Sequence, residues 1–130
     1  MRKKAFTLVE LMLVVIIIGV LVAMIVPRMA GRSEQARNAV AKADVDLNIA
    51  TAIKLYEMDN GSYPSTLDDL LTAPASAANW KGPYLEKKPT DPWGRPYQYK
   101  YPGTHRPQDY DLYSLGKDGI ESGDDVGNWQ

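Results

Sequence analysis

Acidic residues gather near the C-terminus of the 130-residue chain, and their spacing suits the binding of a hard cation. Residues 109–125 contain six acids and a single base, Lys117. Asp118, Asp124 and Asp125 would converge if the glycine-containing loop between them folds back on itself. Carboxylates together with carbonyl and hydroxyl oxygens are the ligands that calcium prefers. The loop lacks the spacing of an EF-hand, and the residues alone favour a solvated acidic loop over a calcium site.

Composition excludes several other kinds of chemistry. The chain has no cysteine, which excludes disulfides, thiolate zinc sites and thiol nucleophiles, and it has one histidine, which excludes multi-histidine metal sites. That histidine, His105, lies in a turn rich in proline and glycine, where we expect it to be exposed. Paired carboxylates can hydrolyse glycosides, but a chain this short leaves no pocket-sized domain around them. The net charge of −1 gives no indication of nucleic-acid binding. We therefore expect a protein that is not an enzyme.

A further carboxylate, Glu10, lies in the most apolar part of the chain. Residues 11–26 carry no polar side chain, and extension back to Phe6 gives 21 residues interrupted only by Thr7 and Glu10. About 20 apolar residues cross a bilayer as a helix. A secretory signal peptide is the rival interpretation, but the length of the run and the lack of a small-residue cleavage site after Val26 favour a retained anchor. Three basic residues among the first four favour a cytoplasmic N-terminus.

The position of Glu10 allows two interpretations. An ionised carboxylate costs about 2.5–3.5 kcal/mol at mid-membrane. The cost is lower near a helix N-terminus, so the side chain could simply reach the interface. Alternatively, Glu10 is a partner charge inside an assembly. A cut just before Phe6 would create a free amine four residues upstream, and this amine, on the same or a neighbouring chain, would neutralise the carboxylate.

Residues 33–59 predict an amphipathic helix. Apolar residues recur at spacings of three and four, and charged residues fill most of the other faces. The apolar positions are Ala36, Val40, Ala43, Leu47, Ala50, Ile53 and the adjoining Ile49 and Tyr56. Asp59-Asn60-Gly61 is a helix-stop signal. If this helix continues from the apolar segment, Pro27 and Gly31 interrupt it, and we expect a kink or local melting there.

The remainder of the chain predicts a small head with a sheet. Residues 65–71 indicate a short helix with Ser65 as N-cap and Asp68 as the capping-box residue. Asp91-Pro92-Trp93-Gly94 fits a β-turn. Two segments alternate as strands do, namely 97–101 and 110–114. A two- or three-stranded antiparallel sheet on the helix would bury one face of each. The predicted fold class is α+β: a long N-terminal helix, half transmembrane and half amphipathic, packed against a small antiparallel sheet.

The N-terminus resembles a processing signal. The run Lys3-Lys4-Ala5-Phe6-Thr7-Leu8-Val9-Glu10-Leu11, followed by the apolar segment and Pro27, is similar to the type III signal of type IV pilins and pseudopilins. The resemblance implies that a prepilin peptidase cuts between Ala5 and Phe6, that the new amine of Phe6 is methylated, and that Glu10 guides filament assembly. The chain departs from the family pattern at Ala5, where the family normally has glycine.

Nearly the whole chain resembles the major pseudopilin of the type II secretion system. The matching segments occur in that family's order, at residues 60–64, 84–85, 91–97, 110–119 and 127–129. The family has a calcium site in its C-terminal loop. The ligands that the resemblance implies are the Leu115 carbonyl, Asp118, the Ile120 carbonyl, Ser122, Asp124 and Asp125. The loop between Gly119 and Asp124 is shorter than is usual for the family. This departure bears on Ile120 and Ser122 as ligands more than on the three aspartates.

The resemblance also implies a function. The chain would be an inner-membrane protein with one membrane span, a cytoplasmic N-terminus and a periplasmic head, and it would polymerise into a periplasmic filament that drives folded proteins across the outer membrane. The implied partners are further copies of the chain, minor pseudopilins, the prepilin peptidase and an inner-membrane platform with a separate ATPase. The alternatives are a surface type IV pilus subunit and a monomeric membrane-anchored calcium-binding module. The expected parts are a leader (1–5), a transmembrane helix (6–27) and a head (28–130), which contains the amphipathic helix (33–59) and the calcium loop (115–125).

Overall fold

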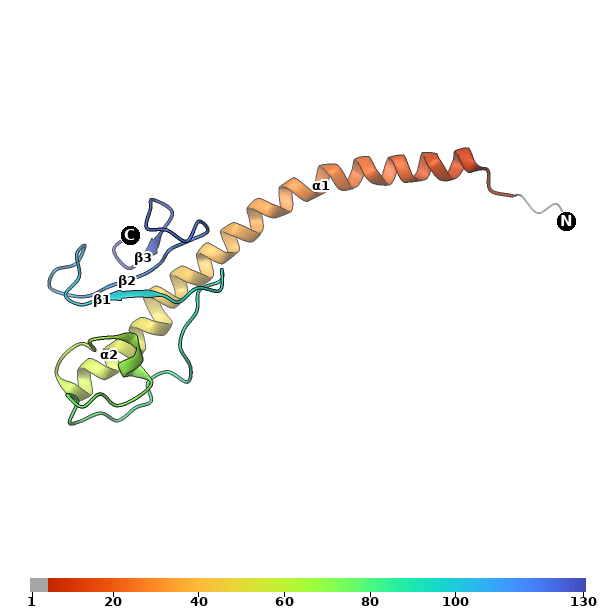
Figure 1. Ribbon diagram of the computed structural model, residues 1–130. Coiled ribbons are helices and arrows are strands. Elements are labelled where there is room, and N and C mark those ends of the chain that lie inside the picture. The colour runs from red at the N-terminus through yellow and green to blue at the C-terminus, as the bar shows by residue number, and fades with distance from the viewer. Residues whose placement is uncertain (1–4) are drawn as a thin grey trace. The chain divides into compact units, whose positions relative to one another are not determined.

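The computed structural model describes residues 5–130, without the side chains of residues 28–30. Its elements are the α-helix α1 (Leu8–Ala43), the π-helix η1 (Asp44–Asn48), the α-helix α2 (Ile49–Asn60), the 3-10 helix η2 (Leu67–Leu70) and the strands β1 (Gln98–Lys100), β2 (Asp111–Ser114) and β3 (Val126–Gly127) (Figure 1). The chain divides into two compact units, Met1–Gln35 and Ala36–Gln130. Apart from Ala5, the expected leader lies outside the described residues.

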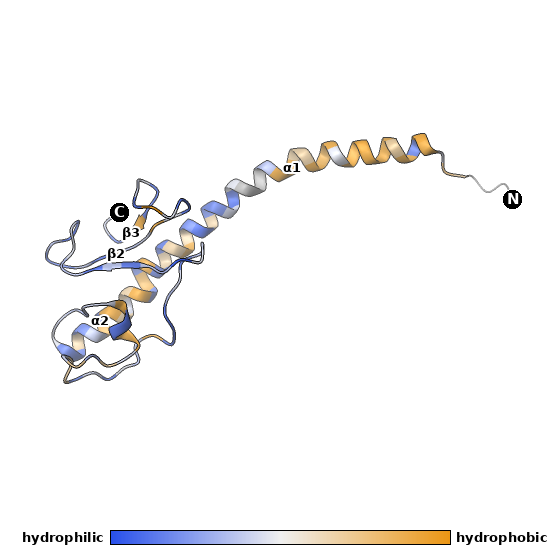
Figure 2. Ribbon diagram, in the orientation of Figure 1, coloured by the Kyte–Doolittle hydropathy of each residue, from blue (hydrophilic) through white to orange (hydrophobic). Residues whose placement is uncertain are grey.

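The first unit is an apolar helix that is exposed along nearly all of its described residues. The large apolar side chains between Leu8 and Val26 are each 44–74% exposed, and Figure 2 shows this stretch as the most hydrophobic part of the chain. An 18-residue window has a mean hydropathy of 3.1, so the helix is long and apolar enough to cross a membrane. Helix α1 continues through Pro27 and Gly31, and the local melting expected there is absent from this single chain.

The second unit, the head, packs around one face of the helix. Ala41, Val45, Ile49, Ile53 and Tyr56 are each at most 4% exposed. They recur mostly every four residues, which is a longer period than the 3.6 residues of an α-helix. The wider turns of the π-helix η1 keep these side chains on one face.

Only the second half of the predicted apolar stripe packs into the core of the head. Val40 and Leu47 are 53% and 64% exposed, and Ala36 and Ala43 are exposed as well. The prediction carried an α-helical period through residues 44–48, and the π-helical segment shifts the face that turns inward. The second half of the stripe was right at Ile49, Ile53 and Tyr56, as the helical part of the core shows.

A three-stranded antiparallel sheet of order β1-β2-β3 covers this face of the helix and confirms the predicted α+β class. Tyr99 of β1 pairs with Leu112 of β2, and Ser114 of β2 pairs with Val126 of β3. Leu112 is fully buried against the helix. The strands are shorter than predicted, and Tyr97 lies just before β1 as a buried core residue.

The predicted end of the long helix was correct, and the predicted start of the short helix was wrong by one residue. Gly61 caps α2 in the left-handed conformation at φ 77°, as the stop signal predicted. The predicted short helix is the 3-10 helix η2, and its N-cap is Thr66 instead of Ser65. Its capping-box residue is Asp69 instead of Asp68, because the Asp69 carboxylate accepts the Thr66 N–H at 3.0 Å. Thr66 is extended (φ −141°, ψ 162°), as an N-cap must be.

Candidate metal loop and processing site

The beginning of α1 is fixed by a reciprocal pair between Thr7 and Glu10. The Thr7 hydroxyl oxygen accepts the Glu10 N–H at 3.2 Å, and Glu10 Oε2 accepts the Thr7 N–H at 3.0 Å. The same Oε2 contacts the Thr7 hydroxyl at 3.1 Å. This is a capping box. The spacing Thr-x-x-Glu would have revealed it, and sequence reasoning missed it.

The capping box leaves the expected cleavage site accessible. Ala5 and Phe6 precede α1, have no regular secondary structure and are exposed. A peptidase needs such an extended, accessible segment. Glu10, in the first turn of α1, lies where a cut before Phe6 would bring a new amine close to its carboxylate along the chain.

Four of the six predicted metal ligands meet at Ser122. The Ser122 hydroxyl lies within hydrogen-bonding distance of Asp118 Oδ2, at 2.9 Å, and contacts Asp124 Oδ1 as well. The Ser122 N–H donates to Asp125 Oδ1 at 3.2 Å. One hydroxyl proton cannot serve two carboxylates at once. The converging oxygens of Asp118, Ser122 and Asp124 are thus a donor set that suits a hard cation.

The two backbone ligands that were predicted lie on either side of Asp118. Its Oδ1 accepts the Ile120 N–H at 3.1 Å, which closes a tight turn, and the Ile120 side chain is 65% exposed. Leu115 precedes Gly116, and a Cβ atom on Gly116 would lie 2.6 Å from the Asp124 carbonyl oxygen and 2.9 Å from its Oδ2. Only glycine therefore lets Asp124 approach the backbone beside Leu115.

The acidic side chains of the loop act on one another. Burial raises the pKa of the Asp125 carboxyl, and the negative charges of Asp124, Glu121 and Asp118 raise it further. The Ser122 hydroxyl lowers the pKa of Asp124. Within residues 5–130, no three acidic, histidine or cysteine side chains are grouped closely enough to hold a metal ion by themselves. A cation here would require the hydroxyl and carbonyl oxygens in addition to the carboxylates.

A buried carboxylate that sequence reasoning missed organises the loop before β2. Asp111 is 2% exposed, and its oxygens accept the N–H groups of Thr104, His105 and Arg106 at 2.6, 2.8 and 3.0 Å. His105 is exposed, as the sequence predicted, with 46% of its side chain accessible. Its ring also stacks on Trp129 with centroids 3.9 Å apart, and its Nδ1 lies 3.2 Å from Asp111 Oδ2.

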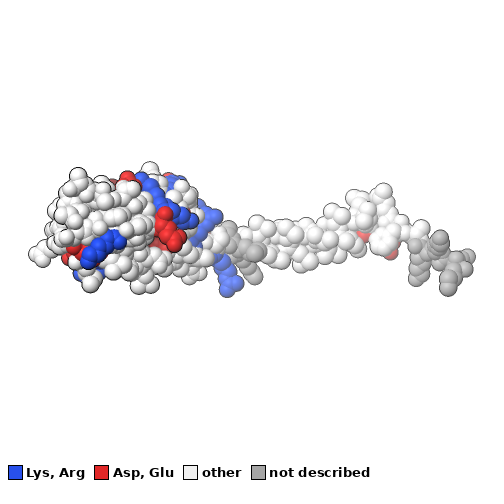
Figure 3. Space-filling view, turned by 90° about the horizontal axis from the view of Figure 1, so that it is seen from below, with Lys and Arg blue, Asp and Glu red and all other residues white. Residues whose placement is uncertain are grey.

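Glu10 is the only charged residue between Phe6 and Pro27. Figure 3 shows the apolar helix with a nearly uncharged surface, and the lysine, arginine and acidic side chains on the head. Several of the head charges form surface pairs, such as Lys54 with Glu57 at 2.8 Å and Lys88 with Asp68 at 3.1 Å. Exposed pairs of this kind contribute little to stability.

Comparison with known proteins gives matches along nearly the entire chain. Residues 1–26 match the family model of the prokaryotic N-terminal methylation motif. The chain is 48% identical to the type II secretion system core protein G of Pseudomonas aeruginosa, over 98% of this chain and 96% of that protein. It is 39% identical to the protein of the same name from Vibrio cholerae, over 99% of this chain and 94% of that one.

A solved structure shares the fold. The crystal structure of the major pseudopilin from the type 2 secretion system of enterohaemorrhagic Escherichia coli matches with a TM-score of 0.67 and 32% identity, over 76% of this chain and 87% of that one. Residues 28–129 match the family model described as type II secretion system, protein G. The chain belongs to the protein G family of the type II secretion system.

Proposed function

We infer that this chain is a structural subunit of the pseudopilus, the periplasmic filament of a type II secretion system. The observation that carries this inference is the bare apolar helix, because a folded head bears a helix whose large side chains from Leu8 to Val26 are all exposed. Apolar surface of this extent requires lipid or other copies of the same helix to cover it. When a subunit passes from the membrane into a filament, neighbouring copies of the helix replace the lipid around it. The names of the relatives and of the matching structure support the same conclusion.

The proposed processing uses the first residues of the chain. A prepilin peptidase cuts between Ala5 and Phe6 and the Phe6 amine is methylated, which the match to the methylation motif supports. The N-terminus begins in the cytoplasm and the head in the periplasm. In the filament, the carboxylate of Glu10 pairs with the Phe6 amine of a neighbouring copy. Assembly involves minor pseudopilins and an inner-membrane platform with a separate ATPase.

The C-terminal loop is proposed to hold calcium through Asp118, Ser122, Asp124 and Asp125, with the carbonyls of Leu115 and Ile120. The donor oxygens around Ser122 and the glycine that lets Asp124 approach Leu115 support this assignment. A bound calcium ion supplies the positive charge that relieves repulsion among the carboxylates. The last proposed ligand, Asp125, directly precedes β3 (Val126–Gly127), which pairs with Tyr113 and Ser114 of β2, so an ion bound there would fix the chain where it enters the sheet.

Overproduction followed by electron microscopy of sheared material tests the proposed function. Cells that produce the full chain together with the secretion platform should yield thin filaments containing it, and the same cells without the prepilin peptidase should yield none. Chain that stays entirely in the membrane fraction as a monomer, with the peptidase present and Phe6 shown by mass spectrometry to be the new N-terminus, would contradict the filament.

A further inference from the structure

A buried hydrogen-bond network lies behind the candidate metal loop. Asp91 is 4% exposed and Ser114 is fully buried. Asp91 Oδ2 accepts the Ser114 hydroxyl at 2.6 Å, and Asp91 Oδ1 accepts the N–H groups of Trp93 and Arg95 at 3.1 and 2.8 Å. Polar groups at this depth are costly unless they are paired. Here one carboxylate receives three donors.

The direction of these hydrogen bonds fixes the orientation of the peptide group between Leu115 and Gly116. The Ser114 hydroxyl donates to Asp91 Oδ2 and keeps lone pairs for the Gly116 N–H, which lies 3.1 Å away. This peptide is trans, so its carbonyl points opposite to its N–H. The Leu115 carbonyl, a proposed metal ligand, is therefore turned away from the buried hydrogen-bond network.

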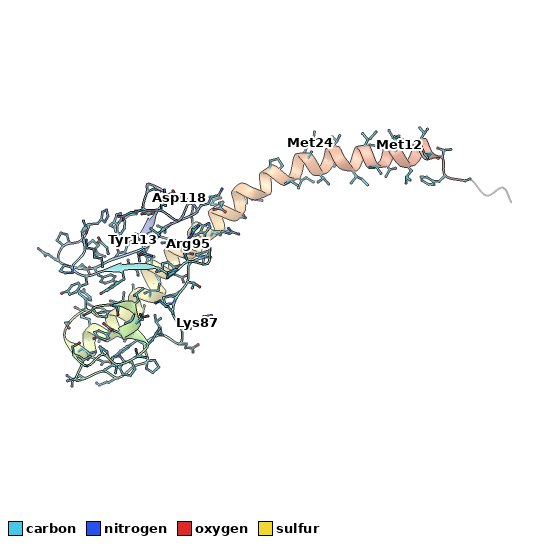
Figure 4. The ribbon with its side chains drawn as sticks, viewed as in Figure 1. Met12, Met24, Lys87, Arg95, Tyr113 and Asp118 are labelled. Carbon is cyan, nitrogen blue, oxygen red and sulfur yellow. The ribbon has the colours of Figure 1, made fainter. Side chains whose placement is uncertain are left out.

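Arg95 holds the next part of the same loop from the other side. Its guanidinium donates to the Gly116 carbonyl at 2.8 Å and to the Lys117 carbonyl at 3.4 Å. Gly119 has φ 73°, and a Cβ atom there would lie 2.5 Å from Arg95 Cζ. Figure 4 shows Arg95 beside the loop that carries Asp118. The loop is wrapped around a planar group with several donors, which a lysine cannot replace.

Both anchors come from one short closed turn, residues 91–95. The Gly94 N–H donates to the Asp91 carbonyl at 2.9 Å, and the Asp91 N–H donates to the Arg95 carbonyl at 2.7 Å. Thr90 and Pro96 pair across its base as an isolated bridge. The turn is thus rigid. Its Arg95 side chain is hydrogen-bonded to Gly116, so the turn positions a loop that lies about 20 residues away in the sequence.

We propose that Asp91, Ser114 and Arg95 are positioning residues that hold residues 114–119 in the ion-binding conformation before any ion arrives. The inference rests on the proposed calcium binding but makes a separate claim about the ion-free loop. Residues that support metal ligands from outside typically change metal affinity by about 10–100-fold when removed. Charge alone predicts the opposite sign, because removing a cation such as Arg95 from beside a cation site should tighten binding.

The test compares Arg95→Met and Arg95→Lys with the matched control Lys117→Met, all in the full chain in detergent micelles. Lys117→Met removes a positive charge from the same loop, where the residue is exposed. Calcium titration calorimetry should show about tenfold weaker binding for both Arg95 variants and unchanged or tighter binding for the control. In chelator, amide exchange of residues 115–119 should be about tenfold faster in both Arg95 variants.

The outcomes separate the two claims. Tighter calcium binding by Arg95→Met with unchanged amide exchange would mean that Arg95 acts only through its charge, and would overturn the proposal. Restoration of both affinity and exchange by Arg95→Lys would overturn it too. Failure of the unaltered chain to bind calcium would refute the metal proposal alone, because exchange of the Gly116 amide in chelator still decides whether Arg95 holds the loop.

Discussion

Replacing Asp111 by asparagine should destabilise the head far more than a conservative surface change would. Both oxygens of the Asp111 carboxylate accept hydrogen bonds, from the backbone N–H groups of Thr104, His105 and Arg106. An asparagine can present an oxygen to only one side of this loop and must turn its own NH₂ toward a donor on the other. Since a hydrogen bond to a charged group contributes about 1.5–3 kcal/mol and a neutral one about 1 kcal/mol, we expect a loss of about 3 kcal/mol.

The loss should also depend on pH with a definite sign. Burial opposes ionisation of Asp111, and the three N–H donors with His105 outweigh it, so the pKa of this carboxyl lies below its usual value of 3.8. Its stabilising contribution is therefore present above pH 3.8 and is lost as the pH falls through the lowered pKa. An asparagine side chain does not titrate, so the gap between Asp111→Asn and the unaltered chain should be full at pH 7 and close below pH 3.8.

Thermal unfolding followed by tryptophan fluorescence measures this difference in the full chain. All three tryptophans lie at or after residue 80, so the signal reports the head and not the apolar helix. About 3 kcal/mol corresponds to a Tm lower by roughly 12 °C for a head of this size. Asp68→Asn is the matched control, since the Asp68 side chain is 61% exposed in a surface pair, and it should cost less than about 1 kcal/mol. Equal Tm values for Asp111→Asn and the control, or a gap unaffected by acid, would refute the reasoning.

Three further predictions concern assembly and the loop. Glu10→Ala should leave membrane insertion intact but reduce filament yield in electron micrographs. Glu10→Gln keeps the capping box and removes only the charge, so normal filaments from it would contradict charge pairing. Millimolar calcium should raise the Tm of the head by the equivalent of about 2.7 kcal/mol at a hundredfold excess over Kd, and magnesium by less. Asp118→Ala or Asp125→Ala should remove most of this effect, whereas identical melting in calcium and in chelator would exclude it. A filament map should show loss of helix between Gly19 and Gly31, and an unbroken helix there would contradict the prediction.

The features that the sequence predicted correctly depend on neighbouring residues. An uninterrupted apolar run identifies the exposed helix, Gly61 supplies the positive φ that ends α2, and the turn beginning at Asp91 has its proline and glycine in the required places. Each signal is contained within a few positions of the element that it specifies. The capping box of Thr7 and Glu10 is of the same kind and was equally predictable.

The features that it could not predict depend on tertiary contacts. The buried face of the helix follows the π-helical turn at Asp44–Asn48, which no local preference indicates. Arg95 carries no recognisable motif, because its partner is a backbone carbonyl 21 residues away, that of Gly116. Asp111 carries none either, because its three partners are backbone N–H groups of the preceding loop, which any residue type supplies. The predicted metal ligands remain a prediction. The structure adds that Ser122, one of the two residues placed in doubt by the short loop, stands between the carboxylates.

The turn at residues 91–95 connects the loop to the core of the head as well as holding it. Two residues beyond Arg95, the buried Tyr97 donates its hydroxyl to Asp44 Oδ2 of η1 at 2.8 Å. Burial, together with the Asp44 carboxylate, raises the pKa of Tyr97, so the hydroxyl stays protonated and the bond persists across physiological pH. The turn is thus joined to Gly116 on one side and to the π-helix on the other. We therefore expect order in the loop to be coupled to the packing of sheet against helix, so that calcium bound as proposed would stabilise the whole head and not only the segment that contacts the ion.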